Sequence, residues 1–236
     1  MDLALELKSL AVLRGRLDDS VPRPIVNGHV QVNLHTGDDD YLCLYSDHEV
    51  LVASDGSFEI GGLRAASGQV IAMCDGWVSK LVPPRTPQES RMQMSANVTG
   101  TDRNRSLARA QKRERLAQCV DVAAGQDLVI EMEPVGELEV RVTDEEGAPL
   151  AGVPISAWPY VLWTGVGSIV FPWRDWNAIS DANGIGRIAN LPPATTFVGI
   201  EASAHQLRRV DRNTHPKAAV ESGKSTRLEL VLEKIH

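Results

Sequence analysis

The sequence predicts an all-β protein built from two tandem antiparallel β-sandwiches, with a short helical insertion in the first. Three observations support this prediction: apolar and polar residues alternate over short stretches, turns rich in Gly, Pro and Asp separate these stretches, and the chain repeats itself. Period-two alternation indicates a strand with one buried face. A chain of 236 residues is long enough for two domains of about 100 to 120 residues each.

The overall composition excludes several classes of protein. Hydrophobic residues make up 43% and charged residues 23% of the chain, as in ordinary globular proteins, and the formal net charge is -7. Nucleic acid is therefore not an expected partner, because phosphate binding normally needs a basic surface. No stretch approaches the roughly 20 apolar residues of a membrane span, and no signal peptide stands at the start.

The first strand pattern occurs three times. The segment DLVIEMEPVGELEVRVTD from Asp127 aligns without a gap with DLALELKSLAVLRGRLDD from Asp2, and RLELVLEK near the C-terminus repeats its first half. Residues 2–8 thus resemble the closing strand of a preceding copy, which predicts that the chain comes from a longer array. The alternative is that this strand completes the first domain by itself.

A second block also recurs and sets the expected domain boundaries. The segment SDGSFEIGGLRAASGQVIAMCDGWVSK from Ser54 corresponds to SDANGIGRIANLPPATTFVGIEASAHQ from Ser180. Each block is typical of a turn, a strand, a second turn and a second strand. We therefore expect one domain over residues 1–134 and another over residues 135–236. Because the last strand of one leads directly into the first strand of the next, a semi-rigid spacer is expected.

The repeats resemble a known family. GELEVRVTDEEGAPLAGVPISAW, followed by SDANGIGRIANLPP and VESGKSTRLELVLEK, is similar to the carboxypeptidase regulatory-like domain. That family is a small antiparallel β-sandwich related to the transthyretin fold and to the B-type repeats of collagen adhesins. The resemblance covers most of both repeats and implies two transthyretin-like or Ig-like sandwiches. In the second repeat, Val140, Val142, Val153 and Ile155 are expected to face the core.

The second repeat departs from the family pattern in its aromatic residues. The first repeat keeps an aromatic residue at Phe58 and has Trp77, expected in the core, where the family has a tyrosine. In the second repeat, Ile188 is expected to occupy the aromatic position. The same repeat carries a tryptophan-rich insertion over about residues 158–178, which would refill the core if its rings turn inward.

This insertion also supplies the candidate binding residues. The segment WPYVLWTGVGSIVFPWRDW holds four of the five tryptophans of the chain. Exposed tryptophans are enriched in binding hot spots and present flat faces for stacking. The candidate ligand-binding residues are Trp163, Trp173, Arg174 and Trp176, and the expected ligand is a polysaccharide or a protein. The alternative is that the rings are buried, as most tryptophans largely are.

The first repeat contains a polar and basic insertion. We expect a short helix within about residues 84–118, where DRNRSLARAQKRERLAQ has six basic and two acidic residues and is rich in helix-favouring types. Its apolar stripe is thin, which is typical of a helix lying loosely on the sandwich. The alternative function of this segment is contact with an acidic partner.

Motifs for catalysis or metal binding are not found in the sequence. The acidic segment HTGDDDY from His35 lacks the ligand spacing of a known calcium loop, so a solvated turn is favoured over a calcium site. Cys43, Cys74 and Cys119 form no C-x-x-C pair. No nucleophile-elbow, zinc-protease or phosphate-loop pattern is present. The sequence therefore predicts no catalytic residue, no cofactor and no metal.

These observations together predict a non-catalytic segment of a larger bacterial protein, located outside the cytoplasm. Its expected partners are the other domains of a longer parent chain, and its expected role is that of a spacer or interaction module. The alternative is a carbohydrate- or peptide-binding module that uses the stretch from Trp158 to Trp176. A third hypothesis is an intracellular interaction protein that uses the basic segment over residues 102–118.

Overall fold

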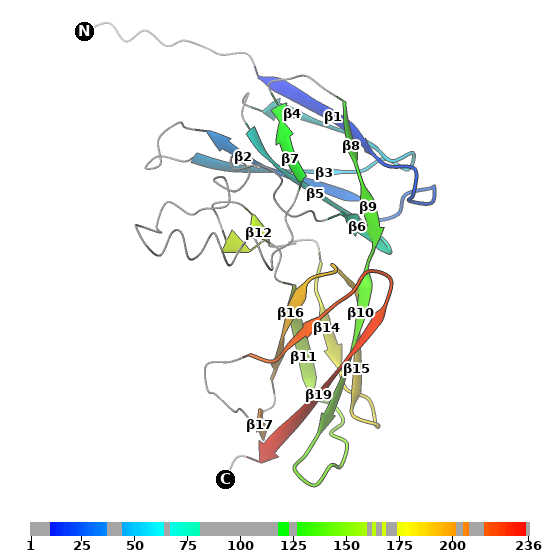
Figure 1. Cartoon of the computed structure of the whole chain (residues 1–236), viewed down its shortest axis with the longest axis vertical. Coiled ribbons are helices and arrows are strands. Elements are labelled where there is room, and N and C mark those ends of the chain that lie inside the picture. The colour runs from blue at the N-terminus through cyan, green and yellow to red at the C-terminus, as the bar shows by residue number, and fades with distance from the viewer. Residues whose placement is uncertain are drawn as a thin grey trace, which may run out of the picture. The chain divides into compact units, whose positions relative to one another are not determined.

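The computed structural model describes residues 10–36, 44–63, 67–80, 118–122, 127–159, 162–163, 167–168, 174–201, 205–207 and 215–234 (Figure 1). Throughout these ranges the regular structure is β-strand, as the alternation predicts. The chain divides into two compact units: unit 1 holds the described residues up to Met132 together with Trp163, and unit 2 holds those from Glu133 to Leu162 and from Gly167 onward. The helical insertion expected over about residues 84–118 lies outside the described residues, except for Gln118, which belongs to a strand.

Unit 1 consists of two facing sheets. One has the strand order β4-β1-β8, and the other has the order β3-β2-β5-β6-β9, with β7 also pairing β5. The opening strand β1 pairs antiparallel with β4 and parallel with β8. The strands are β1 (Ala11–Leu17), β2 (His29–Thr36), β3 (Leu44–Leu51), β4 (Ser57–Leu63), β5 (Ser67–Cys74), β6 (Trp77–Ser79), β7 (Gln118–Asp121), β8 (Leu128–Ile130) and β9 (Met132–Pro134).

The core of unit 1 lies between these sheets. Alternate residues of β1, β4 and β8 point inward and pack against alternate residues of β2 and β5, because successive side chains of a strand face opposite sides. Trp77 packs against this core, as expected for that position. The central core residues are Leu13, Leu17, Val30, Val32, Leu34, Phe58, Ile60, Val70, Ala72, Cys74 and Ile130.

Unit 2 is also a two-sheet sandwich. One sheet has the order β15-β10-β19-β17, and the other has the order β14-β11-β16-β18. Among the described strands, β12 (Leu162–Trp163) and β13 (Gly167–Ser168) form a separate two-stranded sheet, in which Trp163 is assigned to unit 1. The sandwich strands are β10 (Gly136–Thr143), β11 (Pro154–Pro159), β14 (Asn177–Ile179), β15 (Ile185–Leu191), β16 (Thr195–Ile200), β17 (His205–Leu207), β18 (Lys217–Ala219) and β19 (Ser225–Lys234).

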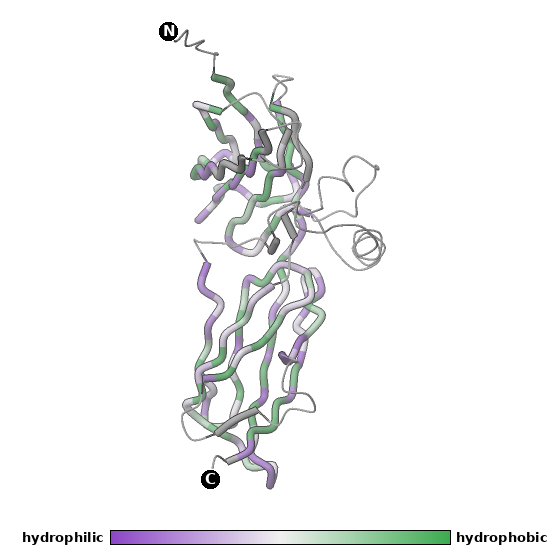
Figure 2. Tube along the Cα trace, turned by 90° about the vertical axis from the view of Figure 1, so that its left-hand side faces the viewer, coloured by the Kyte–Doolittle hydropathy of each residue, from purple (hydrophilic) through white to green (hydrophobic). Residues whose placement is uncertain are grey.

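The core of unit 2 confirms the inward-facing residues predicted from the alternation. Hydrophobic and hydrophilic residues follow one another along the strands (Figure 2), and the hydrophobic set meets between the two sheets. The four residues expected to face the core are all buried. The core consists of Leu138, Val140, Val142, Val153, Ile155, Ala157, Ile188, Leu191, Val198, Ala218, Val220, Leu230 and Leu232.

The opening strands of the two units pair with the same irregularity. In unit 1 the register shifts where Leu13 faces Ile60 but Ala11 faces Leu63, and in unit 2 Leu138 faces Ile188 but Gly136 faces Leu191. The extra residue on the partner strand marks a β-bulge. Within each bulge one residue has a positive φ, namely Gly62 at 76° and Asn190 at 58°. Glycine and asparagine are the residues that tolerate this conformation best.

The register corrects one expectation from the sequence. Ile188 faces Leu138, just as Ile60 faces Leu13, so Ile188 does not occupy the position of Phe58. Phe58 instead faces Gly15, and the corresponding pair in unit 2 is Gly186 with Val140. The large residue of this pair lies on β4 in unit 1 and on β10 in unit 2, and the pair fills the core in both units.

Two aspartates close the turns that lead into β4 and β15. The Asp55 side chain accepts a hydrogen bond from the backbone N–H of Ser57, and the Asp181 side chain accepts one each from Asn183 and Ile185. These backbone donors lower the pKa of both carboxyl groups below the ordinary value of 3.8, with the N–H of Ser57 as the main cause at Asp55 and that of Ile185 at Asp181. Both aspartates are thus favoured as carboxylates in the folded chain.

We expect Gly15→Ala to destabilise unit 1 by about 2 kcal/mol. A Cβ atom at Gly15 would lie 2.5 Å from the backbone oxygen of Leu128 and 2.6 Å from the Phe58 ring. At Gly186 a Cβ atom would meet only the end of the Ile155 side chain at 2.5 Å, which can shift. Gly186→Ala is therefore the matched control, and urea unfolding should show the smaller loss for it. Equal losses would contradict the packing described here.

We expect Asp181→Asn to lower the free energy of unfolding at pH 7 and to reduce the loss of this free energy between pH 7 and about pH 3. A lowered folded-state pKa means that the carboxylate stabilises the fold above its unfolded pKa, and that this contribution is lost as the pH falls through the folded value. Urea unfolding at pH 7 and at about pH 3 measures this difference. Glu145→Gln, at another exposed turn, is the control and should change neither value.

Candidate binding surfaces

Of the four predicted site residues, the structure describes the side chains of Arg174 and Trp176. For Trp163 the structure describes the backbone, which is part of β12, but not the side chain. Trp173 falls outside the described residues altogether. Arg174 and Trp176 are described, and both are half-buried. The sequence-predicted site therefore remains a prediction for the first two residues, while the structure defines the surroundings of Trp176.

Trp176 packs against the core of unit 2. Its indole N–H donates a hydrogen bond of 2.9 Å to the backbone carbonyl of Asn190, the positive-φ residue of the β15 bulge. The ring lies among the partly buried residues on the edge of the core. Because both its N–H and part of its ring are engaged, Trp176 adds aromatic surface to the core, in agreement with the refilling alternative for this one ring.

Of the two tryptophan side chains that the structure describes in this stretch, Trp158 and Trp176, the exposed one is Trp158. It belongs to β11, since that strand continues through Trp158 and Pro159, two residues that the sequence analysis assigned to the insertion. The inward side chains of β11 are Ile155 and Ala157, so Trp158 points away from the core and is 53% exposed. The alternation of buried and exposed residues along β11 is enough to place Trp158 on the outer face. Pro159 directly after it is unfavourable inside a central strand, so the strand was not expected to continue this far.

The indole of Trp158 lies against the neighbouring strand β16. It occupies the space that a side chain at Gly199 would take, because a Cβ atom there would lie 2.4 Å and 2.6 Å from two ring carbons. Its direct cross-strand neighbour is Phe197, which is half-buried. An open groove of about 520 Å³ is lined by residues of β11 and β14 and by Glu201, which follows β16. Its polar side chains are those of Ser156, Asn177 and Glu201.

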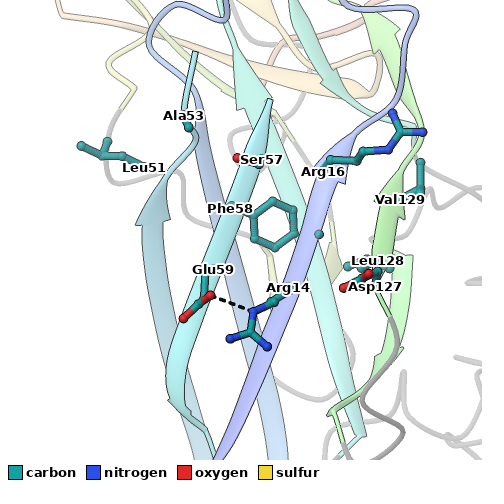
Figure 3. Close-up of a pocket in the computed structure, with 11 residues that line it drawn as sticks. Arg14, Arg16, Leu51, Ala53, Ser57, Phe58, Glu59, Asp127, Leu128 and Val129 are labelled. Carbon is teal, nitrogen blue, oxygen red and sulfur yellow. Dashed lines mark hydrogen bonds and ion pairs between the residues drawn. The ribbon is translucent and has the colours of Figure 1, made fainter. Parts of the chain in front are cut away.

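A second open groove, of about 540 Å³, runs over the β4-β1-β8 sheet of unit 1 (Figure 3). An ion pair of 2.8 Å joins Arg14 on β1 to Glu59 on β4 across it. Leu51 and Val129 are exposed apolar residues along its sides. Both charged groups are more than half exposed, so the pair contributes little to stability.

The described residues do not assemble a metal centre. Among them, no group of three or more His, Cys, Asp or Glu side chains lies close enough to hold a metal ion. The acidic segment beginning at His35 falls largely outside the described ranges. Cys74 is buried in the unit 1 core. No helix within the described part of the chain is long and apolar enough to cross a membrane.

Comparisons with known proteins give only distant likenesses. No protein-family model matches the chain, and no curated protein matches it. Among solved structures, the minor pilin GBS52 of Streptococcus agalactiae shares 15% identity at a TM-score of 0.44, covering 96% of this chain and 97% of the pilin. The shaft pilin SpaA of Lactobacillus rhamnosus GG shares 8% at 0.28, covering 96% and 98%.

A 3-chlorocatechol 1,2-dioxygenase from Rhodococcus opacus is also similar in part. It shares 18% identity at a TM-score of 0.28, over 44% of this chain and 62% of the enzyme. All three TM-scores lie below 0.5. The strand pairing and the two buried cores establish the β-sandwich fold without these likenesses.

We expect Trp176→Phe to destabilise unit 2 by about 1 kcal/mol, because the hydrogen bond to the Asn190 carbonyl is lost while most of the packed ring is retained. Trp158→Phe is the matched control, since it shortens an exposed ring that makes no such bond. Urea unfolding should separate the two variants. A larger loss for Trp158→Phe would contradict the placement of both rings.

Proposed function

We propose that this chain consists of two tandem copies of a carboxypeptidase regulatory-like module and acts as a non-catalytic spacer segment of a larger extracytoplasmic protein. The copies would span residues 1–134 and 135–236, with the helical insertion in the first. The correspondence of strand pairing supports this proposal. Each unit has an opening strand between an antiparallel partner and a parallel closing strand, and each has the same bulge.

The surface charges around the opening strands also support a duplication. In unit 1, Arg14 on β1 stands between Glu59 on β4 and the register position of Asp127 just before β8. In unit 2, Glu139 on β10 pairs with Arg187 on β15 and Arg227 on β19, each at 3.2 Å. The signs are reversed at corresponding positions. An attractive arrangement has thus been kept while the individual residues have changed.

The observation that carries the spacer role is the junction. Strand β9 ends at Pro134 and β10 begins at Gly136, so a single residue connects them. The carbonyl of Pro134 accepts a hydrogen bond from the Ser222 hydroxyl, and the carbonyl of Val135 accepts one from the Gly223 N–H. These hydrogen bonds lie within unit 2. The spacer role is supported by the chain itself, in which no separate linker segment stands between β9 and β10.

The second candidate function is a binding module that uses the stretch from Trp158 to Trp176. The exposure of Trp158 on a regular strand favours it, because a large aromatic side chain on the outer face of a sheet is common at binding sites. The two candidates are compatible, since a spacer module can also carry a binding face.

Two autonomous modules should unfold in two separable transitions in urea. Leu13→Ala should lower the free energy of unfolding of unit 1 and Leu138→Ala that of unit 2, each by about 2 to 5 kcal/mol, because each removes a buried leucine from one core. Each substitution should therefore lower the midpoint of its own transition only. Circular dichroism with tryptophan fluorescence follows both transitions. A single transition that both substitutions shift equally would argue against two independent modules.

A further inference from the structure

The outer faces of the corresponding sheets are used differently in the two units. The hydrogen bonds from Val52 to Gly28 and from Ser180 to Val153 align β2 with β11, so that Gln31 corresponds to Ser156. In unit 1 the outward-facing residues of β2 and β5 are nevertheless buried: Gln31, Asn33, Gln69, Ile71 and Met73. In unit 2 the corresponding residues of β11 and β16 are more open: Trp158 is 53% exposed, and Ser156 and Gly199 are half-buried. The neighbouring strands β3 and β14 do not differ in this way, since Leu51 is 68% and Ile179 69% exposed.

The exposed ring on this face is already held in place. Gly199 faces Ser156 as Ile71 faces Gln31, so the two residues occupy corresponding positions. Because Gly199 has no side chain, the Trp158 indole has room to lie against β16. One side of the ring is thus packed on the sheet, and the rest is open to solvent. A ring fixed in this way loses little conformational entropy when a ligand stacks on it.

The groove on this face has the polar groups that hydroxyl-rich ligands need. Ser156 offers a hydroxyl and Asn177 an amide, and Glu201 supplies a carboxylate as the charged group among the described lining residues. Apolar surface from Pro154 and Ile179 lies between them. Trp158 is not one of the lining residues, but it follows Ser156 by two positions on the same outer side of β11, so its ring lies next to these hydrogen-bonding groups. None of the described lining residues is a cation that would attract an acidic ligand.

We propose that the outer face formed by β11, β14 and β16 binds a neutral saccharide. The C–H face of one sugar ring stacks on Trp158, and its hydroxyl groups hydrogen-bond with Asn177, Ser156 and Glu201. The volume of the groove lies within the usual range for small-ligand sites. This inference rests on the second candidate function, since it names the ligand class of that binding module.

The backbone around Trp158 argues against a peptide ligand that adds a strand. On one side, β11 pairs with β16 from Ile155 to Pro159. On the other side, it pairs with β14 from Pro154 to Ser156, and the Ala157 N–H donates to the carbonyl of Trp176. These backbone groups of β11 are therefore engaged, so a ligand that stacks on Trp158 has to be held by side chains, as the saccharide of this proposal would be.

The test is isothermal titration calorimetry of the full chain with cellohexaose, xylohexaose, mannohexaose and chitohexaose, and with a proline decapeptide for comparison. We expect at least one of these oligosaccharides to bind. Trp158→Ala should weaken its binding by about tenfold or more. Gly199→Val should have a similar effect, because its side chain takes the place of the ring, and Asn177→Ala should give a smaller loss.

Val26→Ala is the matched control, since it removes an exposed apolar side chain of unit 1 that lines neither groove, and it should leave binding unchanged. Unfolding curves of each variant verify that the fold is intact. No binding of any oligosaccharide at millimolar concentration, or binding that survives both Trp158→Ala and Gly199→Val, overturns the proposal. Self-association that Trp158→Ala abolishes in analytical ultracentrifugation also overturns it.

The outcomes separate this inference from the functions on which it builds. Binding of the proline decapeptide through Trp158, without saccharide binding, would retain the binding module and reject its saccharide specificity. The absence of any Trp158-dependent ligand would reject both. Neither result bears on the tandem spacer, which depends on the separate unfolding of the two cores.

Discussion

Each sandwich is closed by parallel pairing between its opening strand and its closing strand. In unit 2 this pairing extends without interruption from Glu137 with Ser225 to Thr143 with Val231, and in unit 1 β1 pairs in the same direction with β8. Parallel neighbours cannot be joined by a tight turn, so the whole module has to lie between them in sequence. The opening strand thereby becomes a central strand, and its inward residues form the middle of the core.

This constraint acts on pairs of residues more than on single positions. Where Gly15 faces Phe58 in unit 1, Val140 faces Gly186 in unit 2, so the core volume of the pair is maintained although neither residue is the same. The charged residues on the opposite face of the sheet follow the same rule, with the signs exchanged. Close packing requires the combined volume to fit, and the sum rather than the identity is preserved.

The same distinction explains what the sequence predicted. Alternation is a local property, so the inward residues Val140, Val142 and Ile155 of β10 and β11 were correctly assigned from the sequence. The counterpart of Phe58 was assigned wrongly, to Ile188 instead of Gly186, because cross-strand register is a relation between distant segments that alternation along one strand does not give. For Trp158, the alternation along β11 is sufficient to predict that its side chain points away from the core. It gives no information on Trp176, which lies before β14 and is fixed by a hydrogen bond to another strand.

The outer face of a sandwich is where such a module has freedom to change. Substitutions at Ser156, Trp158 or Gly199 leave the backbone ladder of β11 and β16 intact, and they do not alter the inward residues of those strands. Core positions lack this freedom, because a change there has to be matched across a pair. A binding site can therefore be built on the outer face at little cost in stability. Because outer-face residues can change without a matching change elsewhere, the two units can differ on this face while their cores stay alike. Trp158 in unit 2 is 53% exposed, whereas Asn33 at the corresponding position of unit 1 is buried.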